Sequence, residues 1–444
     1  MMRAMRRCFL AMVSAAALSA GAGAGAATFE SVHEPTGAPG TLAFRATYRL
    51  WIPDGVGPLR GLVVHQHGCG EGAGKASVTA IDDLHWQALA QAHGCGLLAP
   101  SYEMKEGENC RLWCDPRNGS DAAFLTALDD LARRSGRPEV ATVPWCLWGH
   151  SGGGFWSTIM LALHPERIAA IWLRSGSCFV ALRKGEIAPV EYPPAAFGVP
   201  MISNPGIKER GDKRHNSAWI GGLDTVAFFR ARGAPVGFAP DPLTGHECGE
   251  SRYLAIAFFD RMLAHRLPQG NATGLVPIAA DAGLVAPIGT DGMPGEPVPA
   301  ASWTGPASRT AWLPDAAFAA QWSRCLRDGF IDDTTPPPAP RDGRSAAAAG
   351  GGVTLTWQAD ADPETGLAGF VIRRDGAEVA RLPHGPAPKS GRALWQGITH
   401  GDTPLKPFAV PEWTDAAGRP GMRYAIESVN AAGGASEPLE IVVP

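Results

Sequence analysis

A glycine-crowded turn after an apolar segment constrains the possible fold of this chain more than any other feature. Residues 144–148 predict a buried strand, and residues 155–164 predict an apolar helix directly after the turn. Between them, Gly149 and Gly153 each stand two residues from Ser151, in the pattern G-x-S-x-G. Because glycine has no Cβ, a strand and a helix can approach closely around a strained residue at the apex. The pattern therefore predicts a sharp strand–turn–helix unit that presents the serine hydroxyl beside a helix N-terminus, where N–H groups favour negative charge.

Segments that predict strands alternate with segments that predict helices over more than half of the chain. Besides the unit above, strands are expected at 42–52, 60–67, 96–100, 168–173, 199–204 and 235–239, and helices at 82–93, 121–135, 217–231 and 253–265. This alternation predicts a doubly wound, mostly parallel sheet with helices on both faces and right-handed crossovers. The expected fold class is therefore α/β, followed by a small all-β sandwich.

Changes in composition divide the chain into further parts. An α/β domain is expected at 27–270, an irregular extension with one helix at 271–333, a linker at 334–350, and a β-sandwich at 351–444. The linker is first rich in proline and then in alanine and glycine, so it is expected to be stiff at its start and flexible afterwards. Beyond it the residues alternate as in strands, and Asp375-Gly376 is a hairpin signal. Such a linker predicts separable domains.

The N-terminus predicts export. Residues 1–7 carry three arginines, residues 8–20 are apolar, and Ala24-Gly25-Ala26 offers a small-residue cleavage site. This is the pattern of a secretory signal, which is too short for a membrane span, so residues 1–26 are expected to be removed and the mature protein to be secreted or periplasmic. Since the net charge is −4 and no basic patch stands out, nucleic acid is not an expected partner.

The cysteines suggest disulfide chemistry rather than metal binding. Nine cysteines, less Cys8 in the signal segment, leave an even number that export permits to pair. Cys110 and Cys114 flank a short polar loop segment and form the favoured pair. Zinc is the alternative, but no histidine pair follows at a suitable spacing, and His65 with His67 lacks a third ligand. No metal or cofactor is expected.

The serine turn, the order of the elements and a late histidine make residues 40–268 resemble an α/β-hydrolase. The resemblance implies a catalytic triad in the chain order serine, acid, histidine, with Ser151 as nucleophile and His246 as general base. A serine hydroxyl needs such an imidazole because it is a weak nucleophile at its own pKa. The acid is expected at Glu209, three residues beyond a turn glycine, where the family often carries an aspartate. Asp212 is the alternative.

The same resemblance implies an oxyanion hole made of two backbone N–H groups. One is expected from Gly152, next to the nucleophile. The other is expected from Cys69, in the turn His67-Gly68-Cys69-Gly70, with either neighbouring glycine as the next choice. Cys69 as half of a disulfide is an alternative role.

Four side chains are expected to contact the substrate. Tyr102 and Glu103 end a strand at the edge of the sheet where the triad is expected. Trp156 and Trp219 lie near the triad in the sequence, and tryptophan faces suit sugar rings or aromatic acyl groups. Burial in the core is the alternative for each tryptophan.

The C-terminal residues 351–444 resemble a fibronectin type III domain, through Trp357, the hairpin signal, and Tyr424 with Asn430 and Gly433. Another small β-sandwich is the alternative. The whole chain resembles secreted esterases of the polyhydroxyalkanoate-depolymerase and feruloyl or acetyl-xylan esterase kind, which often carry a fibronectin-like module. The resemblance implies a serine esterase acting on an ester that is polymeric or linked to a polysaccharide. A serine peptidase and a binding protein on a hydrolase scaffold are the alternatives. Removal of residues 341–444 is expected to spare hydrolysis of soluble esters.

Overall fold

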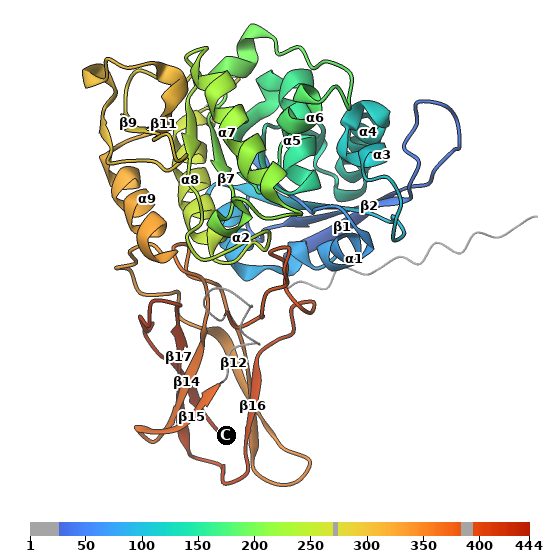
Figure 1. Ribbon diagram of the computed structural model, residues 1–444. Helices are drawn as coiled ribbons and strands as arrows, with labels where there is room; N and C mark the ends of the chain where they lie inside the picture. The colour runs from blue at the N-terminus through green and yellow to red at the C-terminus, as the bar shows by residue number, and fades with distance from the viewer. Residues whose placement is uncertain (1–25, 270–273, 383–393) are drawn as a thin grey trace, which may run out of the picture.

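The computed structural model describes residues 26–269, 274–382 and 394–444, so the expected export signal lies outside the described residues except for Ala26. A wide α/β domain and an elongated β domain lie end to end, and the chain ends in the β domain (Figure 1). Within the described ranges, no helix combines the length and the apolar character that a bilayer span needs.

Eight strands form one sheet in the order β1-β2-β4-β3-β5-β6-β7-β8. Their bounds are β1 (Ala27–His33), β2 (Ala46–Ile52), β3 (Gly61–Gln66), β4 (Cys95–Tyr102), β5 (Trp145–His150), β6 (Ile168–Arg174), β7 (Met201–Asn204) and β8 (Val236–Phe238). β2 pairs antiparallel with β1 and β4, whereas all the other neighbouring pairs are parallel. The expected mostly parallel sheet is confirmed, with the strand order of an α/β-hydrolase. β1 was not expected, because it is a largely exposed edge strand without an apolar face.

Helices cover both faces of this sheet, as the alternation predicts. They are α1 (Glu71–Ser77), α2 (Leu84–Ala92), α3 (Arg111–Cys114), α4 (Ser120–Ser135), α5 (Gly152–Leu163), α6 (Phe179–Arg183), α7 (Asn216–Arg230) and α8 (Ser251–Arg266). α2 and α8 pack together on one face, and α4, α5 and α7 cover the other (Figure 1). The strands β3 to β6 are buried along their whole length, as is typical of parallel strands covered on both faces.

The extension after α8 belongs to the α/β domain and is more regular than expected. It contains the short antiparallel sheet of β9 (Leu284–Pro287), β10 (Val298–Pro299) and β11 (Thr310–Leu313), followed by α9 (Ala316–Asp328), which matches the expected helix. Trp312 and Phe318 are buried in the same apolar core as the large sheet. The extension therefore completes that core.

Two antiparallel sheets form the β domain and share one apolar core, so the expected sandwich is confirmed. One sheet is β12 (Arg341–Ala347), β13 (Val353–Gln358) and β16 (Glu412–Asp415); the other is β15 (Ala377–Leu382), β14 (Gly369–Arg374), β17 (Arg423–Val429) and β18 (Leu439–Val442). The hairpin signal is also confirmed, because Asp375 and Gly376 have φ of 48° and 86° in the turn between β14 and β15. The linker expected at 334–350 is partly wrong, since β12 lies inside it and pairs with β13.

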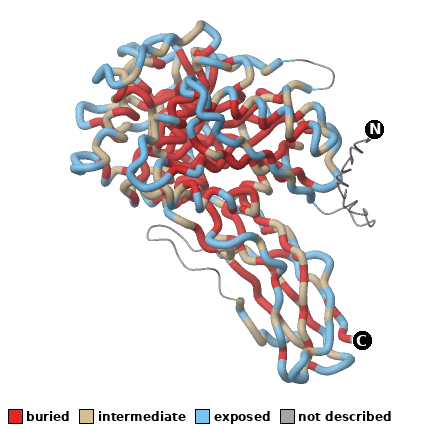
Figure 2. Tube along the Cα trace, turned by 90° about the vertical axis from the view of Figure 1, so that its right-hand side faces the viewer, coloured by how far each residue is buried: buried red, intermediate tan, exposed pale blue. Residues whose placement is uncertain are grey.

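The two domains are joined by more than the chain between them. Buried segments reach across their junction (Figure 2). Leu84 of α2 is part of the core of the β domain, and the buried Arg252 of α8 is paired with the buried Asp402 of the β domain. Removal of residues 341–444 would leave Arg252 without one of its two carboxylate partners and would expose apolar surface around Leu84. That such a truncation spares hydrolysis of soluble esters stays a prediction, and these contacts count against it.

Candidate active site

Ser151 stands at the strained turn that its neighbouring glycines predict. Its φ is 53°, in the left-handed region that side chains other than glycine rarely adopt. A Cβ on Gly149 would lie 2.4 Å from the Gly153 carbonyl group, and one on Gly153 would lie 2.3 Å from the Gln66 oxygen. Neither position therefore accepts a larger residue. The serine backbone is fixed by a 2.8 Å hydrogen bond from its N–H to the Arg174 oxygen.

Three side chains form a continuous hydrogen-bonded line at the carboxyl edge of the sheet. The Nε2 atom of His246 lies 2.9 Å from the Oγ atom of Ser151, and its Nδ1 atom lies 2.5 Å from Oε1 of Glu209. In this arrangement the carboxylate accepts a hydrogen bond from Nδ1–H, which leaves Nε2 without a proton and able to accept one from the serine hydroxyl. In this geometry the imidazole can increase the nucleophilicity of the Ser151 hydroxyl.

Glu209, rather than Asp212, is the carboxylate that meets His246. It ends a short 3-10 helix at Ile207–Glu209 and is 1% exposed. Its Oε2 atom accepts hydrogen bonds from the Gly206 N–H and the Ser175 hydroxyl, both at 3.1 Å. Asp212 is exposed, and its carboxylate instead accepts the backbone N–H groups of residues 214 and 215. These hydrogen bonds lower the pKa of Asp212, and the bond from the backbone N–H of residue 215 has the largest effect.

A buried arginine that the sequence reasoning missed holds the loop that carries His246. Arg174 ends β6 and is fully buried. Its guanidinium group donates to the Asn204 oxygen at 2.8 Å, to the Thr244 hydroxyl at 2.8 Å and to the Gly245 oxygen at 2.9 Å. It also donates to the oxygen of Glu247, just after the histidine. The sequence contains a signal for this role, namely an arginine at the end of an otherwise apolar strand. A buried guanidinium group is costly unless several hydrogen-bond acceptors surround it.

Two further histidines, which the sequence reasoning also missed, contact His246. The ring of His215 stacks on it at 4.2 Å and 6°, and the ring of His150 lies 5.2 Å away. His150 donates from Nε2 to the His246 oxygen at 2.7 Å. Burial, followed by the nearby His246 and Arg174, holds the pKa of His150 well below 6.5. Burial and His246 also lower the pKa of His215. Both neighbours are therefore biased toward the neutral form.

The expected oxyanion turn lies beside the nucleophile, and a disulfide anchors it. A Cβ on Gly152 would lie 3.3 Å from the backbone N of Cys69, so the two expected donors are adjacent. Cys69 is bonded to Cys110, so the expected pairing of Cys110 with Cys114 is wrong. Cys114 is buried on α3, and burial raises the pKa of its thiol. The sequence alone does not predict this pairing, because the two cysteines are 41 residues apart along the chain and only the fold brings them together.

His67 fixes the same turn and does not act as a metal ligand in this arrangement. Its Nε2 accepts the Tyr102 N–H at 3.1 Å, so its Nδ1 is the donor to the Gly68 oxygen at 2.6 Å. Burial lowers the pKa of His67 to about 4, which keeps the ring neutral. His65, the other candidate ligand, stacks on Trp148 at 4.1 Å in the core. The geometry does not support a zinc site at these two histidines.

Three of the four expected substrate contacts are buried. Tyr102 and Trp156 are fully enclosed, and Trp219 is 4% exposed. Tyr102 instead stacks on Trp113, another core residue, at 4.6 Å. These positions correct the expectation of substrate contact, because an enclosed ring presents no face to a ligand. Glu103 is exposed and forms an ion pair with Arg45.

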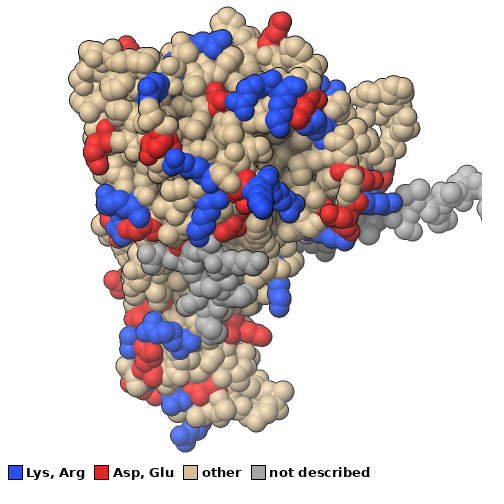
Figure 3. Space-filling view, viewed as in Figure 1, with Lys and Arg blue, Asp and Glu red and all other residues tan. Residues whose placement is uncertain are grey.

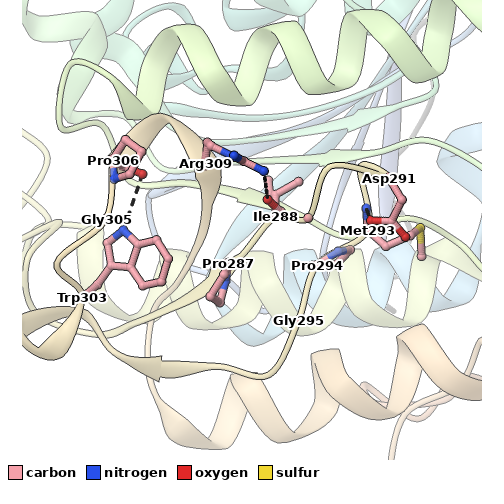
Figure 4. A pocket seen from close by; sticks show the side chains of 11 residues that line it. Pro287, Ile288, Asp291, Met293, Pro294, Gly295, Trp303, Gly305, Pro306 and Arg309 are labelled. Carbon is pink, nitrogen blue, oxygen red and sulfur yellow. Dashed lines mark hydrogen bonds between the residues drawn. The ribbon is translucent and has the colours of Figure 1, made fainter.

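A cavity of about 580 Å³ lies in the extension, not at the triad. Its walls come from the loops around β9 and β11 and are mainly apolar (Figure 4). Trp303 and Arg309 line it, but each side chain is turned toward the backbone of its own wall: the indole N–H toward the Pro306 oxygen and the guanidinium toward the Ile288 oxygen, both at 3.4 Å. The described contacts point to no particular ligand for this cavity.

On the face in Figure 3, acidic and basic side chains lie interspersed, without a broad patch of one sign. This distribution on the visible face offers no electrostatic footprint for nucleic acid.

No protein-family model matches this chain, and no curated protein matches it. Solved structures to which this chain is similar include a ferulic acid esterase, with 16% identity and a TM-score of 0.38, aligned over 54% of this chain and 99% of its own. A dienelactone hydrolase from Anabaena variabilis aligns at 15% identity and a TM-score of 0.37, over 55% and 99% of the two chains. A siderophore hydrolase from Aspergillus nidulans aligns at 16% identity and a TM-score of 0.36, over 55% of this chain and 97% of its own. Each of these alignments covers about half of this chain.

Proposed function

We propose that this protein is an exported serine hydrolase that cleaves carboxylic esters. The observation that carries the proposal is the line from Glu209 through His246 to Ser151, with hydrogen bonds of 2.5 and 2.9 Å. The serine stands at a strained turn and is only half buried, so a substrate carbonyl group can reach its oxygen.

The proposed reaction has two halves. The Oγ atom of Ser151 attacks the ester carbonyl carbon while His246 accepts the hydroxyl proton at Nε2. The backbone N–H groups of Gly152 and Cys69 stabilise the negative oxygen that forms. His246 then gives its proton to the leaving alcohol, and the acyl group stays on the serine. A water molecule, deprotonated by the same histidine, attacks the acyl carbon; the bond from that carbon to Oγ breaks, the histidine returns the proton to Oγ, and the carboxylic acid leaves. Glu209 holds the imidazole in the required tautomer throughout.

The finer parts of the proposal rest on the second domain and on the cysteines. Its antiparallel sheets of three and four strands around one core support the proposal of a fibronectin type III-like module, and such a module would favour an ester carried by a polymer or a polysaccharide. The Cys69–Cys110 disulfide supports a secreted or periplasmic location, because such bonds persist in oxidising compartments.

A fluorophosphonate probe and a substrate screen test the proposal together. The probe should phosphonylate wild-type protein and leave Ser151→Ala unlabelled, with the same melting temperature for both. The screen compares short soluble esters, acetylated xylan, feruloyl esters and polyhydroxybutyrate with the matching amides. Turnover of amides in preference to esters would favour a peptidase. A folded wild-type protein that takes up no label and turns over no ester would contradict the proposal and favour a binding protein.

A further inference from the structure

A loop of the β domain lies against the α/β domain beside the proposed active site. We call residues 394–405, between β15 and β16, the docking loop. Its Gln396 side chain accepts the Leu84 N–H at 2.8 Å and donates to the Asp82 oxygen at 2.5 Å. The oxygen of Pro404 accepts the Thr79 hydroxyl at 2.6 Å. In Figure 1 the β domain meets the α/β domain on the side where α2 lies. These bonds fix the docking loop on the start of α2.

Asp402 is the centre of this contact. It is fully buried, and its φ of 64° is uncommon for a residue with a side chain, so the surrounding contacts must hold it in place. Its Oδ1 atom accepts a hydrogen bond from Nε–H of Arg252 at 2.7 Å, and its Oδ2 atom accepts one from the indole N–H of Trp86 at 2.9 Å. Oδ2 also lies 3.4 Å from Nε2 of His65. Asp83 forms the other ion pair of Arg252.

Asp402 reaches the histidine side of the active site through Arg252. Arg252 is in the first turn of α8, six residues after His246. The docking loop contacts the intervening segment directly, because the Cys248 N–H donates to the His400 oxygen at 3.0 Å. Two contacts therefore hold the chain just beyond the general base.

The serine side is reached through the sheet. His65 on β3 is paired in register with Trp148 on β5, and the two rings stack at 4.1 Å and 17°. Trp148 stands three residues before Ser151. The imidazole of His400 also lies 5.7 Å from the ring of His150, which precedes the serine. One loop of the β domain thus contacts both elements that carry the proposed nucleophile and base.

We propose that Asp402 is a positioning residue of the hydrolase, and that the docking loop makes the β domain a part of the framework of the active site. This inference rests on the proposed function. Apolar packing alone would be enough to join two domains. A buried ion pair adds little stability compared with apolar packing, but it fixes one mutual orientation of its partners. Orientation matters because a displacement of about 1 Å in a catalytic group costs about 10²-fold in rate.

The direct test is Asp402→Asn in the full-length protein. Asparagine keeps the shape of the side chain, but it loses the charge opposite Arg252. If its oxygen accepts from Arg252, its amide N–H₂ faces the indole N–H of Trp86, so two donors oppose each other. We expect kcat on a soluble ester to fall by about 10- to 100-fold, with KM within about twofold of wild type. The rate of fluorophosphonate labelling should fall by the same factor as kcat.

Asp360→Asn is the matched control. It makes the same chemical change in the same domain, where Asp360 pairs with Arg341 at 3.0 Å on the exposed surface. It should leave kcat, KM and the labelling rate unchanged, because neither side chain of the pair is part of the docking loop.

A second variant covers the case in which Asp402→Asn does not fold at the assay temperature. Gln396→Leu removes the two bonds of the half-buried Gln396 to residues 82 and 84 and leaves Asp402 in place. It should lower kcat by about three- to tenfold, again with little change in KM. Wild-type kcat and labelling rates in a folded Asp402→Asn protein, or in Gln396→Leu where the first does not fold, would overturn the inference. A wild-type protein without turnover or label would instead overturn the proposed function, and the inference with it.

Discussion

Replacing Glu209 by glutamine should leave His246 in the wrong tautomer. In the native arrangement, Oε2 of Glu209 accepts a hydrogen bond from the Gly206 N–H, and Oε1 accepts one from Nδ1–H of His246. A backbone N–H can only donate, so the single oxygen of the substituted amide is required at the Gly206 position. The amide N–H₂ then faces Nδ1 of His246, which must become the acceptor. The ring proton is thereby moved to Nε2, where it faces Ser151 and blocks proton transfer.

The size of the effect follows from the loss of the base. A triad with its imidazole in the wrong tautomer loses about 10⁴-fold in kcat, which corresponds to about 5.5 kcal/mol at 1.36 kcal/mol for each tenfold change. Binding of substrate does not use the Nδ1 proton, so KM should stay close to that of wild type. Glutamine has nearly the volume of glutamate and keeps the bond from Gly206, so the fold should survive at this buried position.

The assay is steady-state hydrolysis of a soluble chromogenic ester by Glu209→Gln, with a thermal melt of the same sample. Asp212→Asn is the matched control, since it makes the same carboxylate-to-amide change on an exposed carboxylate that caps the next turn through two backbone N–H groups. Asparagine is as good a capping residue as aspartate, so kcat should stay within about twofold. A folded Glu209→Gln protein with wild-type kcat, or a large loss in Asp212→Asn alone, would refute the tautomer argument.

Three other predictions follow from contacts around the site. Changing both Cys69 and Cys110 to serine should destabilise the fold by about 4 kcal/mol, from the entropy of a loop closed over 41 residues, and should lower kcat; an unchanged urea midpoint would contradict this. Arg174→Lys should lower kcat by about tenfold in a folded protein, because an ammonium group cannot reach all the oxygens that the planar fork binds, and a wild-type kcat would count against this role. Burial lowers the pKa of His67 and His85 to about 4, from 6.5 when unfolded. The unfolded chain then binds more protons between these values, so the free energy of unfolding should fall as the pH drops from 6.5 toward 4; equal urea midpoints at neutral pH and at about pH 5 would disprove it.

Features written in local sequence could be predicted. The need for glycine on both sides of Ser151 can be recognised from a segment of five residues, because the backbones of the strand and the helix approach each other there. Glu209 could be selected over Asp212 because it lies closer to the end of its strand, and the triad atoms meet at that edge of the sheet. The hairpin at Asp375-Gly376 depends on only two residues with positive φ.

Features that depend on distant partners could not be predicted from one sequence. Cys69 pairs with Cys110 because the fold brings the residue just before α3 next to the turn of Cys69, which the spacing of the cysteines does not reveal. Substrate contact is wrongly predicted for Tyr102 from its place at a strand end and for Trp156 from its aromatic face, because neither feature tells in sequence whether a ring lines a cleft or the core. β12 reads as a flexible linker because it is an edge strand whose side chains are mostly exposed, so it has no apolar alternation.

Three long-range contacts hold the loops that would carry the chemistry, and each contact holds a different segment. The Cys69–Cys110 disulfide holds the oxyanion turn, Arg174 holds the loop of His246, and Asp402 holds Arg252 at the start of α8. Loops at the carboxyl edge of a parallel sheet have few backbone partners of their own, so their geometry must come from side chains. Two of the three holding side chains are charged and buried, and such groups orient their partners more than they stabilise the fold. We therefore expect substitutions at Arg174 and Asp402 to reduce kcat by a larger factor than their effect on melting temperature would suggest, and substitutions of the surrounding apolar residues to do the opposite.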